Sequence, residues 1–303
     1  MNAHSPRPSA TAAAPGVAPA RKKKTGSRAW RAVRHNLPFL IGASILLAVA
    51  LIAICAGVLY PGDPRDMVTL PLSWPLTDNE YPLGSGSLGT DLASGLAHGA
   101  QASLLVGVSA ASVGLLIGIL VGAIGGYFGG IADDILVRIT ELFQTVPTFL
   151  LVIVLVAISG PSLPIIAGAI GVATWPTVAR LVRAEFRTLR SNDFVLAARS
   201  LGYSTTRIIF GEILPNALPP IVVTTSVLAA NAILTEAGLS FLGMGDPNLV
   251  SWGSMIADGR SLLRTEWFVT ALPGAAITLT VLSLNLVGDG LNDILNPRSE
   301  SNR

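Results

Sequence analysis

Charge is what this sequence has least of. Only 13% of its 303 residues are charged, whereas a soluble domain carries about 25%, and 51% are hydrophobic. A disordered chain, a coiled coil and a nucleic-acid binder all need more charge than this, and so does an ordinary soluble enzyme. The composition therefore predicts a polytopic membrane protein with lipid, and not nucleic acid, around it.

Cysteine and histidine are also scarce. Cys55 is the sole cysteine, so the chain can form neither a disulfide framework nor a cysteine-based metal site, and we expect a small apolar packing residue there. The three histidines, His4, His35 and His98, are too scattered to suggest a metal cluster. The sequence predicts no metal site and no cofactor in this chain.

Lysine is confined to positions 22–24. A P-loop places a lysine after its glycines, where it reaches the β and γ phosphates, and no glycine loop precedes these three. No nucleophile with its base and no pair of carboxylates suited to acid–base work is evident. We therefore predict that the chain is not an enzyme and has no ATPase site of its own.

Six apolar segments are long enough to cross a membrane as helices, which takes about 20 residues. The first, 37–60, contains no charged residue and is too long for the apolar core of a signal peptide, so we interpret it as an uncleaved span. The other five lie near 103–128, 142–159, 163–182, 218–239 and 267–287. The predicted fold class is all-α, with six transmembrane helices.

These spans divide the chain into five parts. We expect a basic, Ala- and Pro-rich cytoplasmic tail (1–36), a first transmembrane helix (37–60), an extracytoplasmic segment (61–102), a five-helix core (103–290) and a C-terminal tail (291–303). With both termini inside, the cytoplasmic side holds seventeen of the twenty Lys and Arg residues. Because cytoplasmic loops collect these residues, we predict cytoplasmic N and C termini.

The second span carries glycines at every fourth position, Gly114, Gly118, Gly122 and Gly126. On a helix they form a nearly smooth stripe, which lets a neighbouring backbone approach closely. We predict a packing seam, with a partner helix in this chain or in another subunit. Four arginines that share a face beyond the fourth span are instead expected to lie at the membrane interface and not to bind substrate: Arg180, Arg183, Arg187 and Arg190.

The spans offer few ionisable groups. An ion-coupled carrier needs such groups at mid-membrane, and the best candidate is Glu236, near the outer end of the fifth span. Asn231 is polar but does not titrate. We treat both as candidates for the pathway or a gate, with the alternative that Glu236 sits at the interface and bonds to its neighbours. The scarcity favours an energised partner subunit over self-contained transport.

The loop 192–216 has the features of a protruding pair of short helices. Asn192 or Asp193 can cap the first helix, Ala197 and Ala198 give it a small-residue face, and Gly202 permits a turn that other residues resist. A second helix is expected near 205–210, ending by Leu214 ahead of Pro215. Such a pair can dock in a cleft of another protein.

This loop resembles the cytoplasmic "EAA" loop of permease subunits in ABC importers. That loop has two alanines, a glycine four positions after the second, and a Leu-Pro beyond, which Ala197, Ala198, Gly202, Leu214 and Pro215 match. Leu196 replaces the usual glutamate, and Glu212 stands where many relatives have isoleucine. By this resemblance the ATPase-coupling residues are these five matches together with Asp193.

Two further stretches narrow the resemblance to the dipeptide/oligopeptide/nickel permeases, and to the second permease of the pair. One is 236–243, reading EAGLSFLG, with Ser-Trp-Gly at 251–253; the other is 288–293, reading GDGLND, with Pro-Arg at 297–298. The segment 88–91 begins the family's motif before the second span, but the Gly-Arg-Asp that normally follows is missing. The segment 88–102 is therefore shortened relative to the family.

The resemblance implies the permease fold of a type I ABC importer, a multi-pass protein of the bacterial plasma (inner) membrane. It also implies a homologous partner permease, two cytoplasmic ATPase subunits that use ATP-Mg, an extracytoplasmic solute-binding protein, and a di- or oligopeptide substrate. Nickel or another small solute is an alternative within this class. From a different class, an ion-coupled carrier or a structural membrane subunit is the other alternative.

Overall fold

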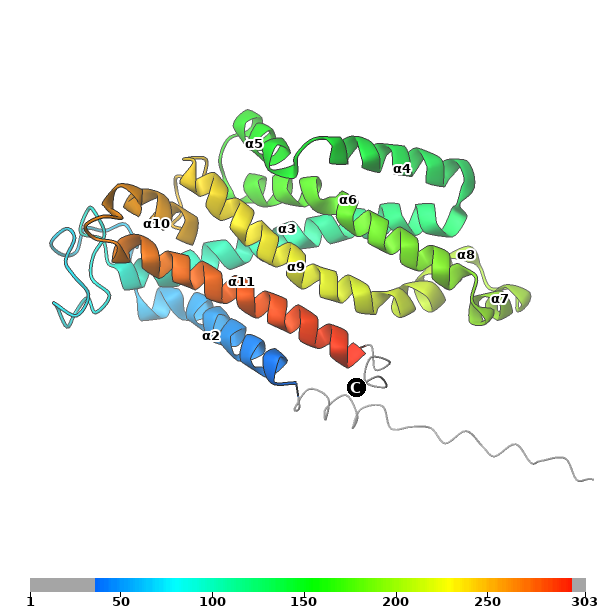
Figure 1. Ribbon diagram of the computed structural model, residues 1–303, viewed down its shortest axis with the longest axis horizontal. Helices are drawn as coiled ribbons and strands as arrows, with labels where there is room; N and C mark the ends of the chain where they lie inside the picture. The colour runs from blue at the N-terminus through cyan, green and yellow to red at the C-terminus, as the bar shows by residue number, and fades with distance from the viewer. Residues whose placement is uncertain (1–35, 296–303) are drawn as a thin grey trace, which may run out of the picture.

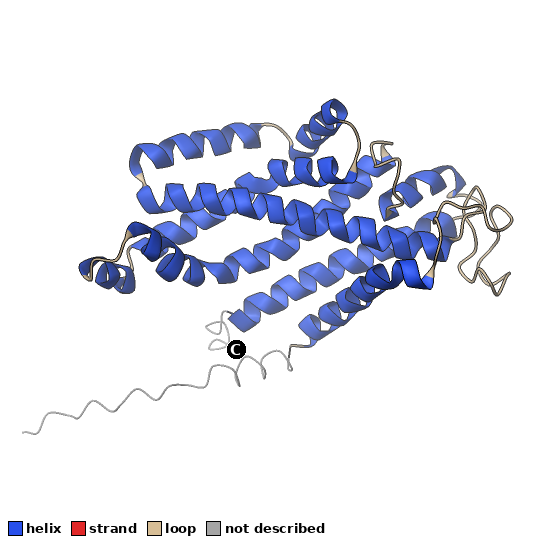
Figure 2. Ribbon diagram, turned by 180° about the vertical axis from the view of Figure 1, so that it is seen from behind, coloured by secondary structure: helices blue, strands red, loops and turns tan. Residues whose placement is uncertain are grey.

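The computed structural model describes residues 36–295, which form a bundle of long helices (Figure 1). Figure 2 shows helices joined by loops over this range. Five stretches are long and apolar enough to cross a bilayer: α2 (Leu37–Leu59), α3 (Leu92–Phe128), α6 (Leu163–Arg190), the continuous stretch Thr205–Phe241 that ends in α9 (Leu214–Phe241), and α11 (Phe268–Leu295). The predicted all-α, multi-span fold class is confirmed, while the tails 1–35 and 296–303 lie outside the described residues.

The predicted third span, 142–159, is not one helix. The chain instead forms α4 (Gly130–Thr145) and α5 (Thr148–Ser159), which are bent by 83° to each other. Pro147 explains the break, because a proline disfavours helical geometry in the preceding residue, and Val146 is extended (φ −87°, ψ 128°). At 1.5 Å per residue α5 is only about 18 Å long, so a sixth crossing requires counting the bent pair as one broken span.

The second span begins earlier than predicted. α3 starts at Leu92 and not at 103, and Asp91 caps it by accepting hydrogen bonds from the backbone N–H groups of Ala93 (2.9 Å) and Ser94 (3.2 Å). Residues 92–102 are too polar to read as part of a span, yet their small residues pack one side of the helix into the bundle. Tyr60 caps the end of α2, and the irregular segment that leads from it to α3 is therefore 61–91.

The second short helix of the loop does not end at Leu214. α8 (Thr205–Arg207) passes into a π-helical segment, η1 (Ile208–Ile213), and then directly into α9. Pro215 occupies the first turn of α9, where its missing N–H is tolerated. The wider π turn joins the two helices through a bond from the N–H of Leu214 to the carbonyl of Ile209.

Two other helices extend beyond the apolar segments that predicted them. α6 continues past 182 to Arg190, and α11 continues past 287 to Leu295, so the first five residues of the predicted C-terminal tail are helical. α2 lies beside α11 (Figure 1). Its buried residues are the small ones Gly42, Ala53 and Ala56, and most of its large side chains are exposed. Cys55 is among the exposed residues, so it is not the packing residue we expected.

The bundle has two distinct ends (Figure 1). At one end lie the segment 61–91 and the short helix α10 (Trp252–Gly259), which the 3₁₀ turn η2 (Arg260–Leu262) follows. At the other end lie α7 (Asp193–Ser200), α8, the start of α4, the start of α2 and the end of α11. The loop that resembles the coupling element is thus separated from α10 by the length of the bundle.

Candidate coupling surface and polar sites

The inner side of α7 is fixed to the bundle. Val195 (0% exposed) and Ala198 (4% exposed) belong to a hydrophobic cluster that includes Phe186 of α6 and Ile208 of η1. Ala198 is therefore small because it packs inside the chain, whereas Ala197 is exposed. The predicted cap is only positional: Asn192 precedes the helix, but its side chain makes no capping hydrogen bond.

Gly202 ends α7 in a left-handed turn, with φ +77°. The N–H of Gly202 donates to the carbonyl of Arg199 (2.9 Å) and the N–H of Tyr203 to the carbonyl of Ala198 (3.1 Å), which is the Schellman pattern of helix termination. A Cβ on Gly202 would meet nothing within 4 Å. The requirement for glycine is therefore conformational and does not come from crowding inside this chain.

The outward side of this loop is apolar. Phe194, Leu201 and Phe210 are exposed by 36%, 73% and 59% of their surface, and Gly202 and Asp193 are exposed beside them. We call the exposed residues Asp193, Phe194, Leu196, Ala197, Leu201, Gly202 and Phe210 the hairpin surface. Of the remaining predicted coupling residues, Pro215 is exposed at the base of the hairpin and Leu214 packs partly against the cluster beneath it.

The four spaced glycines of α3 face α6 of the same chain. A Cβ on Gly122 would lie 2.5 Å from the carbonyl oxygen of Ala179, and one on Gly126 would lie 2.7 Å from that of Arg183. Gly114 and Gly118 likewise meet the backbone and side chains of α6. Close approach between the two backbones therefore requires glycine here, and within residues 36–295 the seam's partner is α6.

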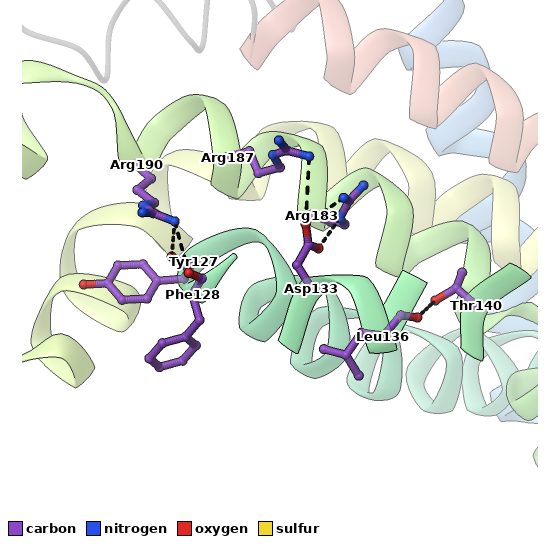
Figure 3. Close-up of polar contacts among 8 residues, drawn as sticks. All are labelled: Tyr127, Phe128, Asp133, Leu136, Thr140, Arg183, Arg187 and Arg190. Atoms are coloured by element: carbon purple, nitrogen blue, oxygen red, sulfur yellow. Dashed lines mark hydrogen bonds and ion pairs between the residues drawn. The ribbon is translucent and has the colours of Figure 1, made fainter. Parts of the chain in front are cut away.

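The arginines beyond the apolar part of α6 form defined contacts (Figure 3). Arg183 makes a two-pronged ion pair with Asp133 of α4, in which one hydrogen bond measures 2.7 Å, and Arg187 lies 3.9 Å from the same carboxylate. Arg190 donates to the carbonyl of Tyr127 (2.7 Å) at the end of α3. Arg183, Arg187 and Arg190 thus join α3, α4 and α6, a structural role in addition to the interfacial position that we expected for them.

Asp133 is a residue that the sequence analysis missed. Its side chain is 9% exposed, and its partner Arg183 is 50 positions away. Because no short motif spans that distance, only the folded arrangement of α4 against α6 identifies the pair.

Glu236 lies inside the chain, at the junction of α9 and α10. Its side chain is 4% exposed, and its Oε1 accepts hydrogen bonds from Ser240 (2.7 Å) and from Ser251, the residue that caps α10 (2.7 Å). Oε2 has no hydrogen-bond partner among residues 36–295. Asn231 is exposed on another side of α9, so the structure does not bring the two candidates together.

The end of α10 carries a second carboxyl group. Burial raises the pKa of Asp258, and the positive charge of Arg65 opposes that shift.

Trp252, at the start of α10, donates from its indole N–H to the carbonyl of Leu96 in α3 (3.0 Å). α10 is therefore attached to both α9 and α3 through its first residues.

The chain matches known transport proteins over most of its length. The family model for the binding-protein-dependent transport system inner membrane component matches residues 114–301. The di/tripeptide transport system permease protein DppC of Pseudomonas aeruginosa is 38% identical, with 89% of this chain and 91% of the relative covered. The dipeptide transport system permease protein DppC of Escherichia coli K12 is 39% identical, with 89% and 92% covered.

A solved structure supports the same fold. An inward-facing structure of the MetNI methionine ABC transporter superposes with a TM-score of 0.53 at 20% identity, covering 64% of this chain and 93% of that one. Family, relatives and fold agree with the helices described above. The chain therefore belongs to the binding-protein-dependent transport system inner membrane components, the multi-pass permeases of ABC importers.

Proposed function

We propose that this permease carries di- or oligopeptides across the plasma membrane, together with a homologous permease, two cytoplasmic ATPase subunits and an extracytoplasmic solute-binding protein. The relatives named for peptide or dipeptide transport support the substrate class, because they align over nine-tenths of the chain. The chain itself supplies no ATPase site, since its only lysines lie at 22–24. ATP-Mg belongs to the partner subunits.

The hairpin surface is the observation that carries this proposal. A half-buried helix that ends in a left-handed glycine turn exposes Phe194, Leu201 and Phe210 at one end of the bundle. Single exposed apolar residues are common, but a group of aromatic and aliphatic side chains on a protruding element favours an interface with another protein. We infer that this surface sits in a cleft of an ATPase subunit.

The way the hairpin is anchored explains how motion would pass through it. Val195 and Ala198 tie α7 to the core cluster that includes α6, and η1 runs without a break into α9. Closure of the ATPase subunits would therefore push on α6 and α9 together. Gating of this kind is a rigid-body movement of packed helices, and it would turn the pathway between the two permeases from inward- to outward-facing.

The opposite end of the bundle is our candidate for contact with the binding protein. Leu70, Trp74 and Leu76 in the segment 61–91 are exposed by 77%, 50% and 86% of their surface. Trp74 also packs against Phe268, at the start of α11, with the ring centroids 5.2 Å apart and the rings tilted by 47°. A docked protein on this segment would thus bear directly on a transmembrane helix, although the segment 88–102 is shortened relative to the family.

Uptake of labelled dipeptides in a strain that lacks this chain tests the substrate class. The strain should lose uptake and regain it when the chain is restored, whereas nickel uptake, measured in parallel, should not change. Loss of nickel uptake with normal dipeptide uptake would support the alternative solute. Uptake that persists without any ATPase subunit would instead favour an ion-coupled carrier.

A further inference from the structure

A basic pocket of about 460 Å³ opens where α3 ends, α4 begins and α7 crosses the end of α6. This volume lies within the roughly 300–1,000 Å³ of small-molecule sites. The pocket shares Leu196 with the hairpin surface and Gly126 with the glycine seam, but neither feature accounts for the three arginines that line it. The residues that matter to its chemistry are Gly129, Gly130, Asp133, Arg187, Arg190 and Arg199.

The charge inside the pocket is strongly positive. Three guanidinium groups line it, and Asp133 is the one carboxylate in its lining. That carboxylate is already paired with Arg183, from outside the lining. Arg190 donates one N–H group to the carbonyl of Tyr127, and Arg187 lies 3.9 Å from the carboxylate of Asp133 (Figure 3). Among residues 36–295, the positive charge of Arg187, Arg190 and Arg199 is therefore balanced by no carboxylate other than Asp133.

Part of the pocket is lined by glycine backbone, without side chains. Gly129 and Gly130 both have left-handed backbone angles, with φ +67° and +57°, and a Cβ on Gly130 would meet nothing within 4 Å. A ligand can therefore approach the main chain closely at this turn. An anion with several oxygens, such as a phosphate, suits a site made of planar guanidinium groups, because each can donate two parallel hydrogen bonds.

The surroundings of the pocket favour a lipid over a soluble ligand. Directly beside it, Phe128, Ile131 and Ile135 are exposed by 56%, 79% and 55% of their surface. In a membrane protein such side chains lie against acyl chains. A phosphate in the pocket would thus have apolar surface next to it, at the boundary between a charged end of the bundle and its apolar flank.

We propose that this pocket binds the phosphate of an anionic phospholipid headgroup, with the acyl chains lying against the exposed side of α4. The occupant would touch α6 through Arg187 and Arg190, and α7 through Arg199 and Leu196. It would therefore hold the coupling helix at a fixed position relative to the membrane. This inference goes beyond peptide transport and rests only on the chain being a membrane permease.

The test measures lipid binding to the complete purified transporter by native mass spectrometry. Phosphatidylglycerol should bind more tightly than phosphatidylcholine with the same acyl chains. The double variant Arg187→Gln/Arg199→Gln should weaken phosphatidylglycerol binding on the order of 20-fold, since each cation near an anionic surface contributes about fivefold. Arg187 reaches Asp133 at 3.9 Å, and the guanidinium of Arg199 lies over the ring of Tyr127 at 5.5 Å. The unfolding midpoint in phosphatidylcholine should therefore be measured to confirm that the variant is folded.

The control removes the same net charge elsewhere. Arg138→Gln/Arg264→Gln changes one exposed residue of α4, outside the pocket, and one near the far end of the bundle. It should bind phosphatidylglycerol like the unmodified transporter. Equal binding of the two lipids, or equal effects of the two double variants, would overturn the proposal.

A second measurement distinguishes a lipid phosphate from a soluble phosphate ester. Glycerol 3-phosphate, added without lipid, should raise the unfolding midpoint less than phosphatidylglycerol does. Equal protection by glycerol 3-phosphate would assign the pocket to a soluble phosphate ester and overturn the lipid assignment. Because none of these measurements involves uptake, failure here is distinguishable from failure of the proposed peptide transport.

Discussion

Gly202 is the residue at which the backbone conformation of the hairpin is decided. A β-branched residue at φ +77° is strained, at a cost of about 1–3 kcal/mol, so Gly202→Val should distort the turn between α7 and α8. Insertion and membrane abundance should stay nearly normal, because the residue is outside the bundle. We predict that peptide uptake falls at least about tenfold, which corresponds to roughly 1.4 kcal/mol of lost coupling, while ATP hydrolysis becomes uncoupled or the ATPase subunits detach.

Gly211 supplies the matched control for this prediction. It is also exposed, a Cβ there would have only one neighbour, Arg207 Cγ at 4.0 Å, and its backbone angles are not left-handed. Gly211→Val should therefore leave uptake near normal. Gly202→Asn should recover part of the lost uptake, because asparagine tolerates positive φ better than valine. Normal uptake by the Gly202→Val transporter would show that this turn is not the coupling element.

Glu236 allows the two hypotheses about its role to be separated. If its Oε1 only holds Ser251 and Ser240 in place, glutamine keeps a carbonyl acceptor there and alanine does not. We predict that Glu236→Gln retains most of the uptake, whereas Glu236→Ala loses about 1–3 kcal/mol of stability, as measured by thermal unfolding, and most of its uptake.

A titrating residue of the pathway would give the other pattern. In that case Glu236→Gln would impair uptake as severely as Glu236→Ala, with the unfolding midpoint of the glutamine variant unchanged. Asn231→Ala is the control on the same helix, because Asn231 is exposed and does not contact the carboxylate. It should leave the stability of the chain unchanged.

At the scale of helices, apolar runs predicted most of the architecture. The first span was placed to within one residue at its end, and the glycine spacing correctly pointed to a close contact along α3, now seen to be with α6. Run length failed where small residues replaced large apolar ones, as at 92–102. It also failed where arginines continued a helix beyond its apolar part, as at the end of α6. Burial by packing stabilises both segments, and packing is invisible to a hydropathy pattern.

Proline was the other source of error. Pro147 breaks a helix and Pro215 does not, although both precede or begin a long apolar segment. The difference lies in what surrounds them: the π turn before Pro215 accommodates the missing N–H, while nothing comparable precedes Pro147. The ion pair of Asp133 with Arg183 could not be predicted from the sequence either, because it depends on how α4 folds back over α6.

The α3–α6 seam gives a prediction about a whole element. A Cβ on Gly122 would lie 2.5 Å from a backbone oxygen and 2.7 Å from Val182 Cβ, so Gly122→Ala must push the two helices apart. Overpacking of this kind costs about 1–3 kcal/mol. We predict a lower unfolding midpoint and less folded chain in the membrane.

Gly168, on α6, is the control for the seam. A Cβ there would meet nothing within 4 Å, and its backbone is helical. Gly168→Ala should therefore be neutral or slightly stabilising, because alanine favours the helix. Equal stability of the two alanine variants would mean that α3 and α6 can separate at no cost, contrary to the contacts seen here.

At the scale of the molecule, the two ends of the bundle differ in kind. One end gathers the basic pocket, the hairpin surface and the start of α2, and the other gathers α10 and the irregular segment 61–91. The distribution of Lys and Arg predicts that the hairpin end is cytoplasmic. The broken pair α4 and α5 preserves this arrangement only if it crosses the membrane once, so orientation and span number have to be tested together.

Cysteine labelling in intact cells makes that test, on a background in which Cys55 is replaced by serine. Asn79→Cys, in the segment 61–91, and Ser261→Cys, in η2, are the outer probes, because both positions are exposed. Both should react with an impermeant thiol reagent applied to intact cells. Thr206→Cys, exposed on α8, should react only after the membrane is opened. Labelling at position 206 from outside would reverse the orientation, and it would remove the hairpin surface from reach of any cytoplasmic ATPase.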